Sequence, residues 1–215
     1  LLMTTAAQNH LVVFARNPVA GKVKTRLIPA LVADGATALY REMLEATLVM
    51  TSQVSGIEVS LWCDTPGESC KTLAESHGLG CFQQQGADLG ARMHHAFSRQ
   101  LRFSKRVILI GSDCPGMTAD YLDSAFELLC TRDAVIGPAM DGGYVMIGLK
   151  RPEPALFEQI AWGSSNVLDQ TRARLRQLGL HASELAPLHD IDTPGDLAHY
   201  PQYHASYSKY RQTTP

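Results

Sequence analysis

The sequence predicts an α/β protein with three α/β/α layers around a mixed, mainly parallel sheet. Short aliphatic runs alternate with amphipathic stretches of helical length, which is the pattern of βαβ units. Several of these runs are apolar throughout, as strands buried on both faces are. The length of 215 residues, with 45% hydrophobic and 19% charged residues, suits one ordinary globular domain.

The individual elements follow from the same periodicities. The first strand is predicted over 11–15, where five apolar residues follow one another. A polar loop over 17–29 comes next, and apolar residues at helical spacing then predict a helix over 36–53. Further strands are predicted over 57–63, 80–84, 107–110, 134–137 and 144–149. Further helices are predicted over 68–77, 88–101, 118–130 and 166–178. An extended piece that ends at Asp192 and a short helix from Pro194 complete the pattern.

We expect a single domain over 1–200 and a C-terminal tail over 201–215. The tail holds three tyrosines among polar residues. Two alternatives explain it: a frayed tail, which we favour, and an arm that packs on the second subunit of a homodimer.

Composition excludes several classes of partner. Nineteen basic and 21 acidic residues leave a net charge of −2, which lacks the basic footprint of a nucleic-acid-binding protein. The apolar runs are too short to span a membrane, and residues 1–8 lack the regions of a signal peptide. The five cysteines form no CxxC or zinc spacing, so we expect reduced thiols in a cytoplasmic protein.

Four polar clusters follow predicted strands. In open α/β sheets, ligands bind beyond the carboxyl ends of the strands, so these clusters predict an active site at one edge. The clusters lie at 16–26, 111–113, 141–143 and 190–192.

The first cluster carries four cations within eleven residues: Arg16, Lys22, Lys24 and Arg26. It matches neither the Walker A nor the dinucleotide-binding pattern. Arginine and lysine side chains suit phosphate oxygens, and the last three would project to one side of an extended loop. We interpret the cluster as a phosphate-binding loop; the alternative is a solvated basic turn.

The acidic clusters favour a divalent cation. Asp113 follows a buried strand, where it is either a cation ligand or a helix cap. Asp190 and Asp192 alternate around Ile191 and so share one face of an extended segment. Neighbouring carboxylates repel unless a cation or a basic group lies between them. Asp113 and Asp192 would therefore hold Mg²⁺ or Mn²⁺ bridging the ligand's phosphates.

Five segments together resemble a bacterial glycosyltransferase-like family with a glycosyltransferase-A fold. This group includes domains of unknown function and transferases associated with radical-SAM and arsenosugar genes. The segments run in the family's order from about residue 11 to residue 198. They are Phe14-Ala15-Arg16 with Gly21–Leu27, Gln85–Met93, Gly111–Pro115, Asp141–Tyr144 and Asp190–Pro194.

The resemblance implies one nucleotide-diphospho-sugar transferase domain that uses Mg²⁺ or Mn²⁺. Asp113 and Asp192 would then be metal ligands, although Ser112-Asp113 replaces the Asp-x-Asp pair common in metal-dependent glycosyltransferases. Asp113 and Asp141 are the candidate catalytic residues, and Asp141 would be the base for an acceptor hydroxyl. The nucleotide and its phosphates fall to Arg16, Lys22, Lys24, Arg26, Gly111 and Ser112. An acceptor or sugar pocket falls to Gly142, Gly143, Tyr144 and Trp162.

Two other functions remain open at this point. Phospholactate guanylyltransferases and molybdenum-cofactor nucleotidyltransferases share the implied fold, and the former carry a similar Lys-x-Arg-Leu stretch. They attack the α-phosphate of a nucleoside triphosphate and release pyrophosphate. We favour glycosyl transfer from a nucleotide sugar to a small-molecule acceptor over nucleotidyl transfer. A nucleotide-binding regulator without turnover is the remaining hypothesis.

Overall fold

A seven-stranded sheet organises the molecule. The computed structural model describes residues 7–206 and Tyr210. The strand order is β3-β2-β1-β4-β6-β5-β7. Strand β6 runs antiparallel to β4 and β5, while the other pairings of the described sheet are parallel. The strands are β1 (Ala7–Ala15), β2 (Ile57–Cys63), β3 (Gly80–Gln83), β4 (Ser104–Ile110), β5 (Ala134–Pro138), β6 (Tyr144–Leu149) and β7 (Ala182–Glu184). The mixed, mainly parallel sheet confirms the predicted fold class.

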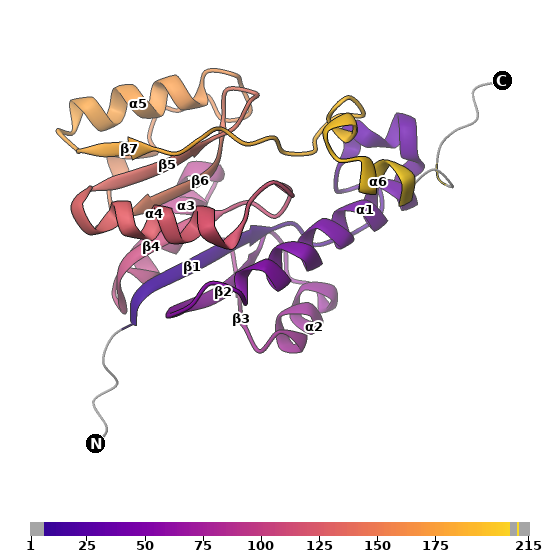
Figure 1. Ribbon diagram of the computed structural model, residues 1–215, viewed down its shortest axis with the longest axis horizontal. Coiled ribbons are helices and arrows are strands. Elements are labelled where there is room, and N and C mark those ends of the chain that lie inside the picture. Colours follow the sequence, from indigo (N-terminus) through magenta and orange to yellow (C-terminus); the bar gives the residue numbers. More distant parts are fainter. Residues whose placement is uncertain (1–6, 207–209, 211–215) are drawn as a thin grey trace.

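Helices cover both faces of this sheet (Figure 1). The α-helices are α1 (Ile28–Thr51), α2 (Glu68–Ser76), α3 (Leu89–Gln100), α4 (Ala119–Thr131), α5 (Val167–Gln177) and α6 (Pro201–Ser206). Short 3₁₀ helices are η1 (Thr25–Leu27), η2 (Pro154–Leu156) and η3 (Asp196–His199). Helix α1 begins eight residues before the predicted start, because Pro29 in its first turn favours helix initiation. A kink at Val32, with φ of 53°, separates this first turn from the rest of α1.

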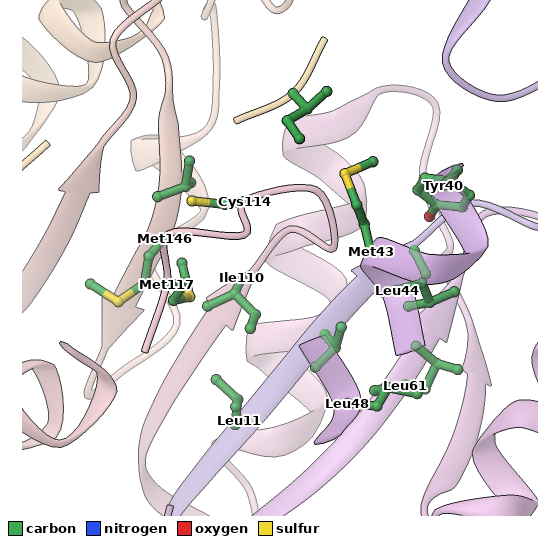
Figure 2. Packing of buried hydrophobic residues seen from close by; sticks show 14 of the residues in the cluster. Leu11, Tyr40, Met43, Leu44, Leu48, Leu61, Ile110, Cys114, Met117 and Met146 are labelled. Atoms are coloured by element: carbon green, nitrogen blue, oxygen red, sulfur yellow. The ribbon is translucent and has the colours of Figure 1, made fainter. Parts of the chain in front are cut away.

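Alternation along the central strands builds two apolar layers. In β1, Leu11 and Val13 belong to one buried cluster, and Val12 and Phe14 belong to the other. Helices α1, α2 and α4 contribute to the first cluster, and α3 and α5 to the second. Figure 2 shows α1 facing Leu11 and the neighbouring strands across the first layer. This packing fixes the start of α1, and with it the loop after β1, against the sheet.

The first part of the segment predicted as a C-terminal tail is helical. Residues 201–206, where the predicted tail begins, form α6 beside α1 (Figure 1). Tyr203 is buried in the first apolar layer, and Tyr210 packs closely against Gly35 of α1. Burial of a tyrosine ring removes a large apolar area from water and so helps to hold so short a helix against the sheet layers. The rest of the predicted tail and residues 1–6, with the signal-peptide expectation, lie outside the described residues.

The helices of the described chain, over 7–206, include none with the length and apolar character needed to cross a membrane.

Candidate functional site

A cleft of 410 Å³ opens at the carboxyl ends of β1, β2 and β4. The strand register brings its walls together. Ala15 lies opposite Cys63, and Val13 lies opposite Ile110, so the segments after all three strands meet at one edge. The cleft is lined by Phe14, Ala15, Arg16, Val23, Lys24, Tyr40, Asp64, Gln84, Leu89, Arg92, Gly111, Ser112, Asp113 and Asp192.

Lys24 lies between the two predicted metal ligands. Its Nζ is 2.8 Å from Oδ2 of Asp113 and 3.6 Å from Oδ1 of Asp192. The Lys24 side chain is 5% exposed. Burial by itself would lower the pKa of Lys24, but the carboxylates of Asp113 and Asp192 outweigh this effect and raise the pKa above its usual value. The ammonium is therefore charged, and it neutralises the acidic side of the cleft.

The other three predicted cations are exposed to solvent. Arg26 forms an ion pair with Asp192 on the solvent side. The Arg16 guanidinium donates to the Lys22 carbonyl at 3.3 Å, and its Nε is 3.9 Å from Oδ2 of Asp64. The side chains of Arg16, Lys22 and Arg26 are exposed. Arg16 lines the cleft and Arg26 pairs with Asp192, which also lines it, whereas Lys24 is the buried cation of the cleft.

Tyr40 of α1 links the loop after β1 to the segment after β4. This residue was not identified from the sequence. Its hydroxyl accepts the Arg16 backbone N–H at 2.7 Å and lies 2.9 Å from Oγ of Ser112. Burial raises the pKa of Tyr40 to about 12, so this hydroxyl stays protonated. Tyr40 lies in the helix predicted over 36–53, but the sequence does not show which groups contact its hydroxyl, because the fold brings them together.

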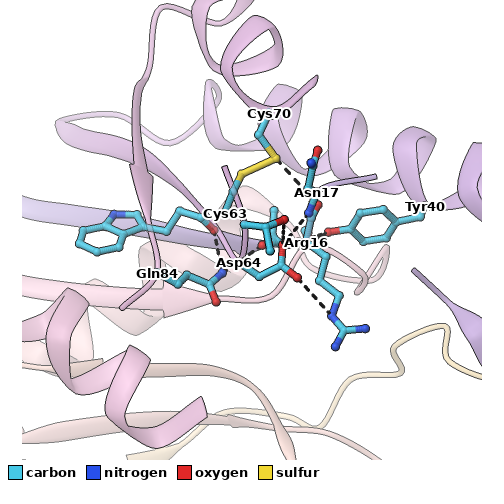
Figure 3. Close-up of a disulfide and its surroundings, with 11 residues drawn as sticks. Arg16, Asn17, Tyr40, Cys63, Asp64, Cys70 and Gln84 are labelled. Carbon is cyan, nitrogen blue, oxygen red and sulfur yellow. Dashed lines mark hydrogen bonds and ion pairs between the residues drawn. A yellow bond between two sulfur atoms is a disulfide. The ribbon is translucent and has the colours of Figure 1, made fainter. Parts of the chain in front are cut away.

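Asp64 and Gln84 were also missed, and they hold the strand ends that frame the cleft. Oδ1 of Asp64 accepts the Asn17 backbone N–H at 2.8 Å. Nε2 of Gln84 donates to the carbonyls of Ala15 and Trp62 at 3.0 and 2.8 Å. Figure 3 shows these contacts around Arg16. Asp64 directly follows one predicted strand and Gln84 is the last residue of another, and this position at a strand end is the signal that could have identified them.

The expectation that all cysteines are reduced is wrong for two of them. Cys63, the last residue of β2, forms a disulfide with Cys70 in α2 (Figure 3). The pair meets because the turn over 64–67 folds back onto Asn17, whose side chain fills the space that a Cβ at Gly67 would occupy. Spacing alone gives no sign of this proximity. The other three cysteines, Cys81, Cys114 and Cys130, are free.

The acidic side of the site extends to Asp190 and Asp141. Burial, followed by the charges of Asp113 and Asp141, raises the pKa of Asp190 to about 6. Asp190 and Asp192 both act electrostatically on Lys24, as expected for two residues on one face. Oδ1 of Asp141 accepts the Gly143 backbone N–H at 2.9 Å, which is the contact of a tight turn. Asp141 is exposed beside the cleft and does not line it.

The structure brings together some of the residues that were predicted to form an acceptor pocket. The rings of Tyr144 and Trp162 meet edge to face, with centroids 6.4 Å apart. The Tyr144 hydroxyl is buried, which raises its pKa and leaves only other parts of the residue accessible to a ligand. Gly142 has φ of +91°, and a Cβ there would lie 2.1 Å from the Ser165 carbonyl oxygen. Close packing of the chain therefore explains the glycine at 142 without a ligand.

The chemistry of the donors fits Mg²⁺ or Mn²⁺. Asp113 and Asp192 direct carboxylate oxygens to one point, where Lys24 now supplies the positive charge. Over 7–206 and Tyr210, no group of three or more His, Cys, Asp or Glu side chains could hold a metal ion. A pair is nevertheless sufficient, because Mg²⁺ usually takes one or two carboxylates, with water and substrate phosphates completing its shell.

Known proteins share this fold. The sequence profile of a family described as "Uncharacterized protein conserved in bacteria (DUF2064)" matches residues 47–164. A protein provisionally described as a nucleotide-diphospho-sugar transferase, from Desulfovibrio desulfuricans G20, is 30% identical with a TM-score of 0.84; the match covers 95% of this chain and 91% of that one. No curated protein matches the chain.

Two more distant structures are similar in fold alone. The 4-diphosphocytidyl-2C-methyl-D-erythritol synthase of Anaerococcus prevotii is 12% identical, with a TM-score of 0.62 and coverage of 93% of this chain and 99% of that chain. Glucosyl-3-phosphoglycerate synthase of Mycobacterium tuberculosis, solved with Mn²⁺, UDP and glucosyl-3-phosphoglycerate, is 10% identical. Its TM-score is 0.55, over 96% of this chain and 82% of that chain.

Proposed function

The chain belongs to the DUF2064 family of bacterial proteins, and we propose that it is a transferase that uses a nucleotide-activated donor. The reaction that the site supports best is glycosyl transfer from a nucleotide sugar to a small acceptor, assisted by Mg²⁺ or Mn²⁺. The observation that carries this proposal is the convergence of Lys24, Asp113 and Asp192 at the carboxyl edge of the sheet. A buried cation between carboxylates, ringed by exposed cations, is suited to a phosphorylated ligand with its metal.

Each side of the cleft has a separate task in this proposal. Arg16, Lys22 and Arg26 would bind the donor's phosphates at the mouth of the cleft, since all three are exposed and Arg16 lines the cleft. Gly111 and Ser112 border the phosphates from β4, and Tyr40 holds Ser112 in place. The similar protein from Desulfovibrio desulfuricans, provisionally described as a nucleotide-diphospho-sugar transferase, supports a nucleotide-sugar donor.

Asp113 and Asp192 would hold the divalent ion through carboxylate oxygens. Bound there, the ion would neutralise charge that develops on the departing nucleoside diphosphate. Glucosyl-3-phosphoglycerate synthase, which shares the fold, has been solved with Mn²⁺ and UDP and with Mg²⁺ and UDP. Those complexes support the choice of metal.

Asp141 is the proposed base for the acceptor hydroxyl. It is exposed on the turn between β5 and β6, and it is close enough to Asp190 to raise the pKa of that residue. An acceptor would lie between this turn and the cleft, with Gly143, Tyr144 and Trp162 beside it. Asp141 would take the hydroxyl proton as the oxygen attacks the sugar carbon, and the nucleoside diphosphate would leave.

Nucleotidyl transfer is the second candidate, and the three exposed cations favour it. Arg16, Lys22 and Arg26 supply more positive charge than a diphosphate bound at Lys24 requires. A nucleoside triphosphate would use this charge along its chain. In that reaction, the acceptor attacks the α-phosphate and pyrophosphate leaves.

Thermal unfolding with a panel of ligands separates these functions. The panel contains nucleoside diphosphates, nucleoside triphosphates and nucleotide sugars, each with Mg²⁺, Mn²⁺ or chelator. A ligand at 100 times its dissociation constant adds about 2.7 kcal/mol of stability, or roughly 2–4 °C for a chain of this size. We expect a metal-dependent shift with one nucleotide sugar, followed by release of nucleoside diphosphate in ³¹P NMR when the acceptor is added.

Matched variants locate the effect. Asp113→Asn should abolish the metal-dependent part of the shift and lower turnover by about 100-fold or more, the scale seen when one preorganised electrostatic group is lost. Asp123→Asn, an exposed carboxylate on α4, should change neither. A shift with triphosphates alone, with pyrophosphate release, would favour nucleotidyl transfer. Binding without turnover of any donor would favour a regulator, and no shift with any phosphate ligand would contradict both reactions.

A further inference from the structure

Lys24 occupies the position that the proposed function gives to a metal ion. Its ammonium contacts Asp113 and Asp192 at once, and it is almost fully buried. Asp190 adds a third negative charge that acts on the same ammonium. The ammonium therefore already supplies a counter-charge to these carboxylates from within the chain.

Removing that ammonium would leave an uncompensated acidic cluster. Carboxylates that converge on one point repel each other unless a cation lies between them. Arg26 cannot replace Lys24 in this respect, because it pairs with Asp192 from the solvent side and its side chain is 67% exposed. Lys24 is thus the internal counter-ion of the pair.

We propose that Lys24 is a positioning residue that keeps a divalent ion out of the site until a phosphate ligand arrives. This inference rests on the metal pair of the proposed function. The ammonium and the metal ion compete for the same two carboxylates, so the metal ion alone should bind weakly. The phosphates of the donor offer Lys24 a second anionic partner, and its transfer to them would free Asp113 and Asp192 for the metal.

The backbone around Lys24 is consistent with a side chain that must change partner. Lys24 has φ of 46° and ψ of 44° at the start of η1, in the left-handed region that lysine seldom adopts. Val32, eight positions after Lys24, also has a positive φ, of 53°. Such residues persist only where the surroundings hold them.

The consequence is positive coupling between metal and phosphate. A ligand that draws Lys24 away raises the affinity for the metal, and by reciprocity the metal raises the affinity for that ligand by the same factor. Metal and donor would therefore enter the site together, and the carboxylate pair would not be loaded by free metal.

Mn²⁺ titration followed by electron paramagnetic resonance tests this without any nucleotide. Lys24→Gln removes the ammonium but keeps a polar side chain, and it should bind Mn²⁺ at least about tenfold more tightly than the unmodified protein, within the range of ordinary allosteric coupling. Arg26→Gln is the matched control, because it removes one cation beside the same carboxylate. Because solvent screens the exposed Arg26 guanidinium, its removal should change the affinity for Mn²⁺ by less than about threefold. The double variant Lys24→Gln/Asp113→Asn should lose the gain.

The outcomes separate this inference from the proposed function. Equal Mn²⁺ affinity in the unmodified protein and Lys24→Gln, or no Mn²⁺ binding to either, would overturn the inference. An equal gain in Arg26→Gln would also overturn it, because the effect would then be one of net charge. Circular dichroism and thermal unfolding establish that each variant is folded, and Lys24→Met provides a second folded form if Lys24→Gln is unstable. Nucleotide binding in the thermal panel can succeed or fail independently of all these results.

Discussion

At the scale of single residues, the candidate site depends on side chains whose partners are distant in sequence. Lys24 and Asp113 are 89 positions apart, and Arg26 and Asp192 are 166 apart. The polar clusters after the strands could be predicted, because strand ends mark the ligand edge of such sheets. Asp113 and Asp192 were also predicted to share one site, but their ion pairs with Lys24 and Arg26 could not be predicted, because the order of strands in the sheet decides which loops meet.

Tyr40 gives the residue-scale prediction. Tyr40→Phe removes the hydroxyl that accepts from Arg16 and bonds Ser112, so both groups lose a buried partner. We expect a loss of about 1–3 kcal/mol in the free energy of unfolding, as for other unsatisfied buried groups. The binding of phosphate ligands should weaken as well, since the loop that starts at Arg16 loses its tie to β4. Urea unfolding and isothermal titration of the nucleotide ligand measure the two effects.

Tyr121→Phe is the control for this variant. The Tyr121 hydroxyl donates to the Ala186 carbonyl at 2.8 Å, outside the cleft. This variant should lose stability without any loss of ligand affinity. If Tyr40→Phe binds ligand as tightly as the unmodified protein does, Tyr40 has a structural role alone.

At the scale of elements, regular structure was predictable where one periodicity dominates. The strand over 57–63 was predicted with its observed bounds, since its aliphatic residues and short length leave little ambiguity. The three-residue strand β7 was predicted only as an extended piece, because its pairing with β5 and not its composition makes it a strand. The prediction missed the first eight residues of α1, because the apolar spacing does not continue cleanly through the kink at Val32.

The turn between β2 and α2 carries the element-scale prediction. The Cys63–Cys70 disulfide closes a loop with a sequence separation of 7, and a loop of this size contributes about 2 kcal/mol in the chain-entropy model. Reduction, or Cys63→Ser with Cys70→Ser, should lower the free energy of unfolding by this amount. It should also weaken phosphate binding, because Asp64 in this turn holds the Asn17 backbone and lies beside Arg16.

Cys81→Ser is the matched control for the disulfide. Cys81 is free and lines the same cavity of 720 Å³ as Cys63 and Cys70, but it carries no link to the turn. Thiol titration under denaturing conditions counts the free cysteines, and urea unfolding with and without reductant gives the stability change. Five free thiols before reduction would show that the bridge does not form in solution.

At the scale of the whole molecule, the candidate site lies at the carboxyl edge of the sheet, while the most deeply buried residues lie in the central strands. Strand β1 lies between β2 and β4, and its apolar residues face both layers. His10 is 5% exposed in this strand, so unfolding transfers its side chain from the interior to water. The pH dependence of global unfolding should therefore report on His10.

Burial lowers the pKa of His10 below 6.5, against a smaller opposing effect of Glu58 on β2. Nδ1 lies 3.6 Å from Oε2 of Glu58, and Nε2 lies 2.8 Å from Oγ of Ser60. On β4, the nearby charge of Arg106 is directed to Asn9. Between the lowered pKa and 6.5, the unfolded chain binds a proton that the folded chain does not. The free energy of unfolding should thus fall as the pH drops from 6.5 through the lowered pKa.

Urea unfolding at pH 7.5 and pH 5.5 measures this contribution, with His10→Gln as the comparison. The variant is expected to start less stable, because it disturbs the bond to Ser60, yet it should lose less stability between the two pH values than the unmodified protein does. Carboxylates such as Asp190 titrate in both proteins, so the difference between the two slopes isolates His10. Equal slopes would mean that Glu58 compensates for burial, and a steeper slope in His10→Gln would mean that the histidine is held in its charged form.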